Sequence, residues 1–331
     1  MLTTSASDNA PGAPHWPALP YMEWKDTRDT LHLWSQIVGK IRLSQSPWLN
    51  HSWHATFYLT ARGMTTSPIP FGARLCEIEF DFVDHVLRIG TDDGAARTMP
   101  LKRRPVADFY RDLMAHMADL GLAVHIYARP NEVLEPIPFA QDTVHAAYDA
   151  IYANRFWRLL LQADRVFKAF RARFIGKSSP VHLFWGSFDL ATTRFSGAEA
   201  PPHPGGVPNC PDWVTREAYS HEVSSGGFWP GNEAMPYPLF YAYAYPEPPG
   251  FKSAPVRPGQ AAYDAGFGEF ILPYEAVRRA PSPDAMLLDF LQSTYDAAAD
   301  LGRWNRAALE RRDATLPSAA MRSNDAVTGK N

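Results

Sequence analysis

The sequence contains few cysteines and no long apolar run. Only two of its 331 residues are cysteines, Cys76 in a strand-like segment and Cys210 in a proline-rich loop, which excludes a disulfide framework and is typical of a reducing cytoplasm. Their spacing matches no zinc motif, and no apolar run approaches the length of a membrane span. The net charge of -3 offers no general attraction to nucleic acid or anionic lipid. We therefore expect a cytoplasmic protein without nucleic-acid or membrane partners, and the sequence leaves its oligomeric state open.

The sequence also lacks the motifs of several large enzyme classes. It has no nucleophile-elbow serine, no phosphate-binding glycine loop with a lysine, no dinucleotide fingerprint and no His-Glu-x-x-His helix. These absences disfavour hydrolases of the common folds, P-loop enzymes, Rossmann dehydrogenases and zincins.

The sequence does contain enough apolar material for a large core. Hydrophobic residues make up 46% and aromatic residues 13% of the chain, which excludes global disorder. We expect a disordered leader over residues 1–14 and a disordered tail over residues 311–331, because neither has an apolar core. The prolines of residues 130–142 break regular structure and predict a linker between an N-terminal half, 15–129, and a C-terminal half, 143–310.

Apolar spacing predicts the same order of elements in both halves, namely a helix, antiparallel strands and a second helix. Helical spacing predicts a helix at the start of each half, at residues 31–41 and 156–174. It predicts a second helix at the end of each half, at residues 106–121 and 287–301. Strands follow from the alternation of apolar and polar residues. They are expected at residues 53–61, 76–82, 87–89, 124–127, 181–190, 217–224, 239–245 and 269–272. The sequence therefore predicts an α+β fold of two similar halves, each an antiparallel sheet flanked by helices.

Short sequence echoes indicate an internal duplication. Residues 37–40 read Ile-Val-Gly-Lys and residues 174–177 read Phe-Ile-Gly-Lys, and residues 107–121 agree with residues 288–302 at several aligned positions. Amphipathic helices that end in glycine also produce such matches by chance, so both interpretations stay open.

Reactive and aromatic side chains are concentrated between residues 179 and 247, on segments that have the pattern of strands. Such a concentration is typical of a half-buried pocket wall, in which aromatic rings pack and polar groups contact a ligand. The candidate catalytic acid/base groups are His182, His221, Glu222 and Asp189.

Three histidines from separate segments have the ligand chemistry of a divalent metal site. His54, His182 and His221 could together hold zinc or iron through neutral imidazoles. The alternative is that each histidine bonds a backbone carbonyl or a tyrosine within the sheet. The sequence leaves the cofactor open between these two interpretations.

A second group of side chains has the chemistry of a ligand wall. An aromatic neighbour on the same strand face would raise the pKa of Asp189 by desolvation, and an arginine could bind a ligand carboxylate through its guanidinium fork. The plainer alternatives are an Asp–Arg ion pair at a strand end and a ladder of tyrosines that packs on a helix. The predicted ligand-binding side chains are Arg62, Trp185, Arg194, Trp229 and Tyr243.

Several short motifs along the chain carry a resemblance to a known family. They are Trp34, Gln36–Lys40, Asn50–His51, Thr60–Gly63, Phe174–Lys177, Pro180–His182, Phe184–Asp189, Ser220–Glu222 and Tyr245–Pro249. On these motifs the sequence from Trp16 to Glu310 resembles the uncharacterised domain-of-unknown-function 5996 family. The resemblance implies a bacterial, soluble, single-chain protein, and it brings no activity, cofactor or catalytic residue with it.

Two hypotheses of function follow from these patterns. The first is an enzyme that acts on a small aromatic or acidic molecule in a pocket lined by His, Trp and Tyr. The second is a non-catalytic small-molecule binding or scaffold protein, in which the aromatic residues form the binding wall and the histidines are structural. In both, the expected partner is a small-molecule ligand.

Overall fold

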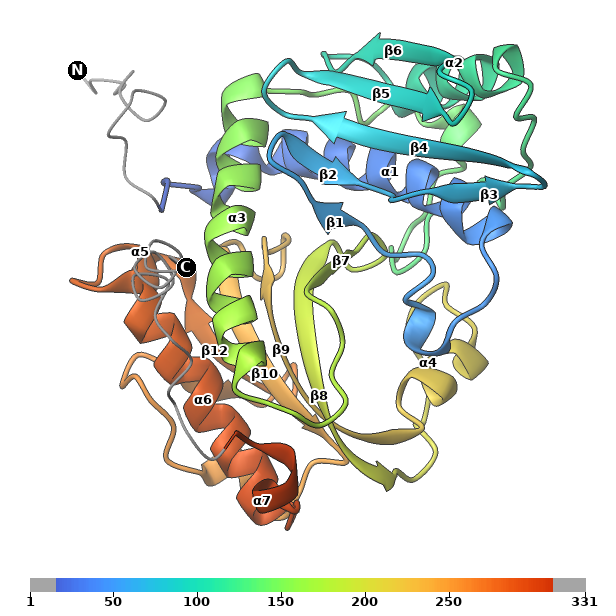
Figure 1. Cartoon of the computed structure of the whole chain (residues 1–331). Coiled ribbons are helices and arrows are strands. Elements are labelled where there is room, and N and C mark those ends of the chain that lie inside the picture. Colours follow the sequence, from blue (N-terminus) through green and yellow to red (C-terminus); the bar gives the residue numbers. More distant parts are fainter. Residues whose placement is uncertain (1–15, 312–331) are drawn as a thin grey trace, which may run out of the picture.

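The computed structural model describes residues 16–311 of the chain. These residues form an α+β fold with two antiparallel sheets of six strands each, which confirms the predicted fold class (Figure 1). The predicted leader, and the predicted tail beyond residue 311, lie outside the described residues. Among residues 16–311, no helix has the length and apolar character needed to cross a membrane.

The first half consists of a long helix, one sheet and a shorter helix. Helix α1 lies across one face of the sheet, and its Trp34 stacks on Phe109 of the second helix at 4.6 Å between ring centroids (Figure 1). The strand order is β1-β2-β4-β5-β6, with β3 paired to β4. The elements are α1 (Tyr21–Gln45), η1 (Asn50–Ser52), β1 (Tyr58–Leu59), β2 (Gly63–Thr65), β3 (Ile69–Phe71), β4 (Arg74–Asp81), β5 (Val86–Thr91), β6 (Ala96–Pro100), α2 (Val106–Asp119) and η2 (Phe139–Gln141).

The second half begins with a helix that Asp149 caps. The Asp149 carboxylate accepts hydrogen bonds from the backbone N–H groups of Ile151 (2.8 Å) and Tyr152 (3.1 Å), which satisfies donors that a helix start leaves free. The strand order of the second sheet is β11-β12-β10-β9-β8-β7. The elements are α3 (Ala150–Ala172), β7 (His182–Phe184), β8 (Asp189–Glu199), α4 (Asp212–Ala218), β9 (His221–Trp229), β10 (Leu239–Tyr245), η3 (Phe251–Ser253), β11 (Ala262–Asp264), β12 (Glu269–Pro273), α5 (Tyr274–Arg278), α6 (Pro283–Leu301) and α7 (Arg306–Leu309).

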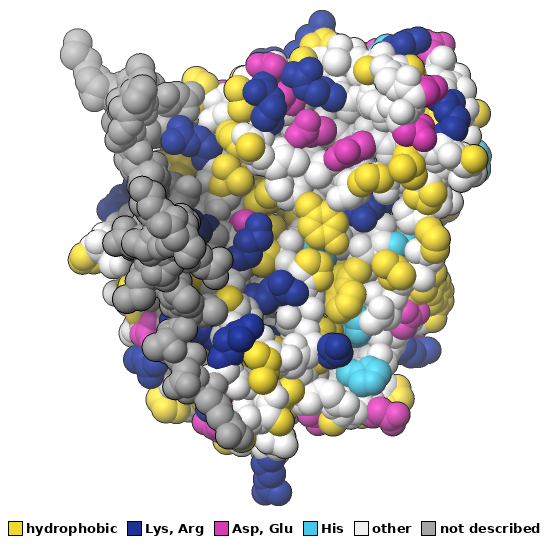
Figure 2. Space-filling model, in the orientation of Figure 1, with side chains coloured by type: hydrophobic (Ala, Val, Ile, Leu, Met, Phe, Trp, Pro, Cys, Tyr) yellow, Lys and Arg dark blue, Asp and Glu magenta, His cyan; other side chains and the backbone are white. Residues whose placement is uncertain are grey.

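The two sheets meet edge to edge and share one hydrophobic core. Phe57 and Leu183 exchange two backbone hydrogen bonds of 2.9 Å each, so that β1 continues into β7 by a single bridge. Helix α3 runs along both sheets (Figure 1), and its Phe156 contacts Phe188 of the second half at 5.1 Å between ring centroids. Figure 2 shows that the Lys and Arg side chains over α3 are separated by apolar and uncharged ones and form no continuous basic stripe on that face.

The two faces of the second sheet differ in chemistry because side chains alternate along each strand. Leu190, Phe228 and Phe240 point to the face that α3 and α6 cover, and all three are fully buried in the main core. Asp189 and Tyr241 belong to the alternate set and point to the opposite face. The sheet therefore presents polar and aromatic side chains on the face that these two helices leave open.

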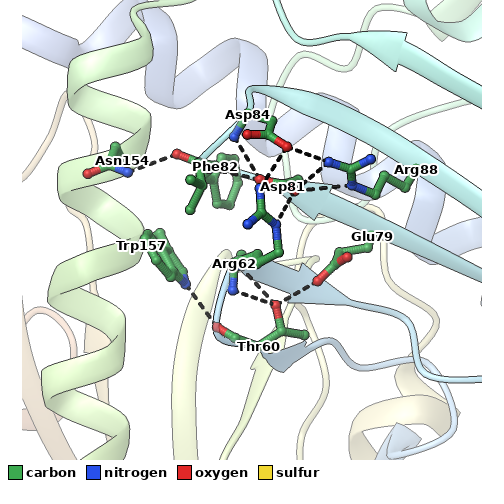
Figure 3. A network of polar contacts seen from close by, with 11 residues as sticks. Thr60, Arg62, Glu79, Asp81, Phe82, Asp84, Arg88, Asn154 and Trp157 are labelled. Atoms are coloured by element: carbon green, nitrogen blue, oxygen red, sulfur yellow. Dashed lines mark hydrogen bonds and ion pairs between the residues drawn. The ribbon is translucent and has the colours of Figure 1, made fainter.

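The first sheet carries a buried carboxylate that is fully satisfied (Figure 3). Asp81, which has no exposed surface, accepts from the Arg62 Nε atom at 2.6 Å, from Arg88 at 3.0 Å, and from the backbone N–H groups of Val83 and Asp84 at 2.9 and 2.8 Å. Burial alone would raise the pKa of Asp81, but these donors outweigh burial and lower the pKa to about 2. The network fixes the tight turn between β4 and β5.

We expect this network to make stability depend on pH in the acid range. Because the pKa of Asp81 is lower in the folded than in the unfolded chain, its stabilisation is complete above its unfolded pKa and is lost as the pH falls through its folded value. Between about pH 5 and about pH 2 the free energy of unfolding of the wild type should fall by about 2 kcal/mol more than that of Asp81→Asn. Urea denaturation across this range measures the difference, and parallel curves for the two proteins would show that Asp81 is not the titrating group.

Four predicted strands differ from the structure. The strand expected at residues 181–190 is divided into β7 and β8 by a turn at residues 185–188, so Trp185 does not share a strand face with Asp189. The strand expected at residues 217–224 begins only at His221, because residues 212–218 form helix α4. The strand expected at residues 53–61 is confined to β1, because the backbone of His51 and Ser52 is left-handed (φ 57° and 56°) and the chain turns before Phe57. Residues 124–127 are irregular. The two sheets also differ in strand order, and the internal duplication stays a prediction.

Candidate functional site

A cavity of about 430 Å³ lies on the open face of the second sheet. Alternate residues of β8, β9, β10 and β12 form its floor. The other walls come from distant parts of the chain: Arg28 and His32 of α1, Glu132 of the 130–142 segment, and Tyr219 at the end of α4. The floor residues are Asp189, Ala191, Thr193, Ser225, Trp229, Leu239, Tyr241, Tyr243, Glu269 and Ile271.

The strand register sets which floor residues are neighbours. Tyr241 on β10 pairs with Ile271 on β12 and with Gly227 on β9, and Gly227 pairs with Ala191 on β8. Gly227 has no side chain, so the tyrosine ring can lie across β9. Its hydroxyl thereby reaches Asp189, which is on the strand beyond.

Asp189 is the buried carboxyl group of the cavity, with 7% of its surface exposed. Its Oδ1 atom accepts a hydrogen bond from the Ser187 hydroxyl and its Oδ2 atom accepts one from the Tyr241 hydroxyl. Desolvation raises the pKa of Asp189, and these hydrogen bonds oppose the rise only in part. Within residues 16–311 no Lys, Arg or His forms an ion pair with it. The carboxyl group is therefore held in position by neutral donors alone.

We expect Gly227→Ala to disrupt the floor of the cavity. An added Cβ atom would lie 2.3 Å from the Tyr241 hydroxyl oxygen and 2.5 Å from the Leu190 carbonyl oxygen, and the second contact is with backbone that cannot move aside. We expect the free energy of unfolding to fall by about 1–3 kcal/mol, as measured by urea denaturation. Gly90→Ala is the matched control, because no atom lies within 4 Å of the added Cβ atom in that strand. An equal loss in both variants would contradict the close approach at Gly227.

Two further carboxyl groups, those of Glu132 and Glu269, line the cavity and interact electrostatically with Asp189. Desolvation, with repulsion from Asp189 as the next cause, raises the pKa of Glu132 to about 7 and that of Glu269 to about 8. Lys40 opposes the rise at Glu132. Glu132 is the most exposed of the three carboxyl groups and Asp189 the least, so Asp189 has the least contact with solvent.

Glu132 is held in an uncommon backbone conformation. Its φ angle is 57°, a left-handed value that costs a non-glycine residue about 1–3 kcal/mol unless neighbours enforce it. Its N–H group donates to the Pro208 carbonyl at 3.0 Å. The neighbouring Asn131 N–H group donates to the Gln36 side chain on α1 at 2.7 Å. These contacts fix the 130–142 segment against α1 and direct Glu132 to the cavity.

The remaining walls combine rings and hydroxyl groups. The Tyr219 and Tyr243 hydroxyls are 2.8 Å apart and share a hydrogen bond, and the rings of Tyr241 and Tyr243 stack at 6.1 Å between centroids. Trp229 contacts Phe267 at 5.9 Å between ring centroids. The cavity therefore offers flat apolar surfaces next to hydrogen-bonding groups, which is the usual composition of a small-molecule site.

His32 is a structural histidine in this wall. Its Nε2 atom contacts the carbonyl oxygens of Gly186 (2.8 Å) and Trp185 (3.0 Å), which requires that Nε2 carry a proton and donate. Burial lowers the pKa of His32 to about 3, so the ring is neutral at physiological pH. The histidine ties α1 to the loop before Asp189.

Of the side chains predicted from sequence, Asp189, Trp229 and Tyr243 line the cavity and the histidines do not. His182 is 1% exposed, and its Nδ1 atom contacts the Ala191 carbonyl at 3.1 Å. His54 accepts a hydrogen bond from the Leu49 N–H group, and His221 is exposed at the start of β9. No three His, Cys, Asp or Glu side chains among the described residues are placed to hold a metal ion, so the predicted metal ligands are not brought together.

The other predicted residues also lie outside the cavity. Arg62 binds Asp81 in the first sheet (Figure 3), and Glu222 accepts a hydrogen bond from the Ser196 hydroxyl at 2.7 Å. The Trp185 indole donates to the Ala55 carbonyl at 2.6 Å. Arg194 points to the helix-covered face of β8, where its guanidinium lies 3.5 Å from the centroid of the Phe170 ring.

Sequence reasoning did not single out Arg28, Glu132, Tyr219 or Glu269. A usable signal existed only for Glu269, which stands on a predicted strand in alternation with Ile271. The other three come from segments whose approach to the sheet is a tertiary property.

Comparison with known proteins gives the family of the chain. No curated protein and no solved structure shows significant similarity to it. The model of one family, described as a family of unknown function, matches residues 16–311. That match covers all of the described residues, including both sheets and the cavity on the second sheet. The chain therefore belongs to the family of unknown function DUF5996.

Proposed function

We propose that this protein binds a small organic cation, a primary amine attached to a flat ring, in the cavity on the second sheet. The observation that carries the proposal is Asp189, a 93% buried carboxyl group that faces a cavity and has only neutral hydrogen-bond donors. A buried carboxylate without a cationic partner is costly, and an ammonium group of the ligand would supply that partner with a charge-assisted hydrogen bond.

The other walls support the same ligand class. Glu132 and Glu269 add carboxyl oxygens beside Asp189 that can accept hydrogen bonds from an ammonium group, and the rings of Trp229 and Phe267 offer a flat surface for a ligand ring. Of the two ligand classes proposed from the sequence, an aromatic molecule fits these walls better than an acidic one, because an acid placed beside three carboxyl groups would be repelled.

Three probes that share one ring test the proposal by isothermal titration calorimetry. They are benzylamine, benzyl alcohol and benzoate, which are cationic, neutral and anionic at neutral pH. We expect benzylamine to bind the wild-type protein at least about tenfold more tightly than benzyl alcohol, and benzoate to bind weakest. Equal affinities for the three probes, or preference for benzoate, would refute the proposal.

An acid–base enzyme that acts on such an amine is the second candidate. Its specific support is the pKa of Glu132, raised to about 7, and that of Glu269, raised to about 8, because a proton-transfer group works best near the ambient pH. Mass spectrometry of amines incubated with the protein tests for turnover. Product that disappears with Glu132→Gln or Glu269→Gln supports an enzyme, whereas binding without product supports the non-catalytic binding protein.

A further inference from the structure

We infer that the ligand of this cavity also carries a carboxylate, and that Arg28 and Asn232 bind this group at the end of the cavity away from the three carboxyl groups. The inference rests on the proposed function, since it names the second charged group of the same ligand. It identifies the ligand class as a zwitterion, a cyclic or aromatic amine with a carboxylate at its far end.

Arg28 is a largely buried cation that lines the cavity. Its surface is 91% buried, and it lines the cavity from the first turns of α1. Asp29 pairs with its Nη1 atom at 2.5 Å. The Nε atom is buried and out of reach of a ligand, whereas the Nη2 atom has no protein partner within residues 16–311. A planar carboxylate is the natural partner of a guanidinium fork with unused donors.

Asn232 supplies a second donor at the same end of the cavity. Its amide oxygen already accepts a hydrogen bond from the Met235 N–H group at 2.9 Å, which leaves the amide nitrogen to serve the cavity that Asn232 lines. The adjacent Glu233 contacts Lys25 of α1 at 3.9 Å. This contact holds the β9–β10 loop against the turn of α1 that precedes Arg28.

The positive and negative groups occupy different parts of the cavity. The register of β10 and β12 places Glu269 toward the Tyr243 end of the floor, whereas Asn232 follows Trp229, which pairs with Leu239 at the other end. Among residues 16–311 the carboxylate that forms an ion pair with Arg28 is that of Asp29 and none of the three in the cavity. A single ligand can contact both ends only if its own charges are separated by a ring or chain.

A pair of probes that differ only in the second charge tests the inference. Benzylamine carries the amine alone, and 4-(aminomethyl)benzoate adds a carboxylate across the ring. We expect the wild-type protein to bind the zwitterion at least about tenfold more tightly than benzylamine. In Arg28→Gln the order should reverse, because the added carboxylate then meets only the negative side of the cavity. Arg111→Gln is the matched control, since it removes an arginine that pairs with acidic neighbours on α2 and does not line the cavity, and it should keep the wild-type ratio.

Each outcome separates the inference from the function on which it rests. If benzylamine binds and the zwitterion binds no more tightly in the wild type, the anion subsite does not exist and the amine site stands. If the zwitterion is favoured equally by wild type and Arg28→Gln, another group holds the carboxylate and the inference is wrong. If neither probe binds, the proposed function itself fails. The ratio in the wild type decides the first and last cases even where Arg28→Gln does not fold.

Discussion

Asp189→Asn should weaken the binding of benzylamine by at least about tenfold while the protein stays folded. The amide keeps the shape of the carboxylate, and its oxygen can still accept from Ser187 or Tyr241, so the floor of the cavity is retained. What is lost is the negative charge, together with one acceptor for the ammonium group. Calorimetric titration of both proteins with benzylamine measures the change.

Glu222→Gln is the control for this substitution. Glu222 is also a carboxyl residue of the second sheet, but its side chain bonds Ser196 and does not line the cavity. It should bind benzylamine as the wild type does. Unchanged affinity in Asp189→Asn, or an equal loss in both variants, would place the amine somewhere other than at Asp189.

Arg194→Ala should lower the free energy of unfolding by about 3 kcal/mol or more. Only 2% of Arg194 is exposed, and its guanidinium lies between the rings of Phe170 (3.5 Å) and Tyr295 (4.2 Å). Its Nη2 atom donates to the Phe170 carbonyl at 2.5 Å. Truncation removes these contacts and leaves a cavity between β8, α3 and α6. Urea denaturation measures the loss.

Arg194→Met separates the volume of this side chain from its charge. An unbranched apolar side chain fills most of the space, and replacing a buried charge by a packed apolar group is often close to neutral. We expect Arg194→Met to retain most of the stability that Arg194→Ala loses. Because Arg194 points away from the cavity, neither variant should change the affinity for benzylamine while it is folded. A specific loss of ligand binding in Arg194→Met would restore the sequence-based prediction that Arg194 binds the ligand.

The fold class could be predicted from the sequence because alternation and helical spacing are local properties. The strand at residues 239–245 has the predicted bounds. Its alternation placed Tyr243 on a ligand-facing side, which agrees with the cavity wall. The same rule could have separated Asp189 from Arg194, since residues five apart on a strand point to opposite faces. The prediction that Asp189 and Arg194 belong to one site did not take this alternation of faces into account.

The walls of the cavity that come from outside the second sheet could not be predicted in this way. Arg28 stands on a helix whose facing partner is fixed only by tertiary packing. The position of Glu132 in the cavity wall depends on a left-handed backbone conformation inside a proline-rich segment. Nothing in the sequence of that segment indicates this conformation. The predicted metal ligands are not brought together for the same reason. His54 was expected on a strand but lies in a turn that follows the left-handed residues His51 and Ser52.

The most direct test of the central claim is a crystal structure of the wild-type protein with benzylamine. The claim predicts electron density for the amine in the cavity, with its nitrogen at about 3 Å from an Asp189 carboxylate oxygen and its ring against Trp229 or Tyr241. Benzylamine bound with its nitrogen away from Asp189, or a cavity that stays empty of amine in crystals grown with saturating benzylamine, would contradict the account.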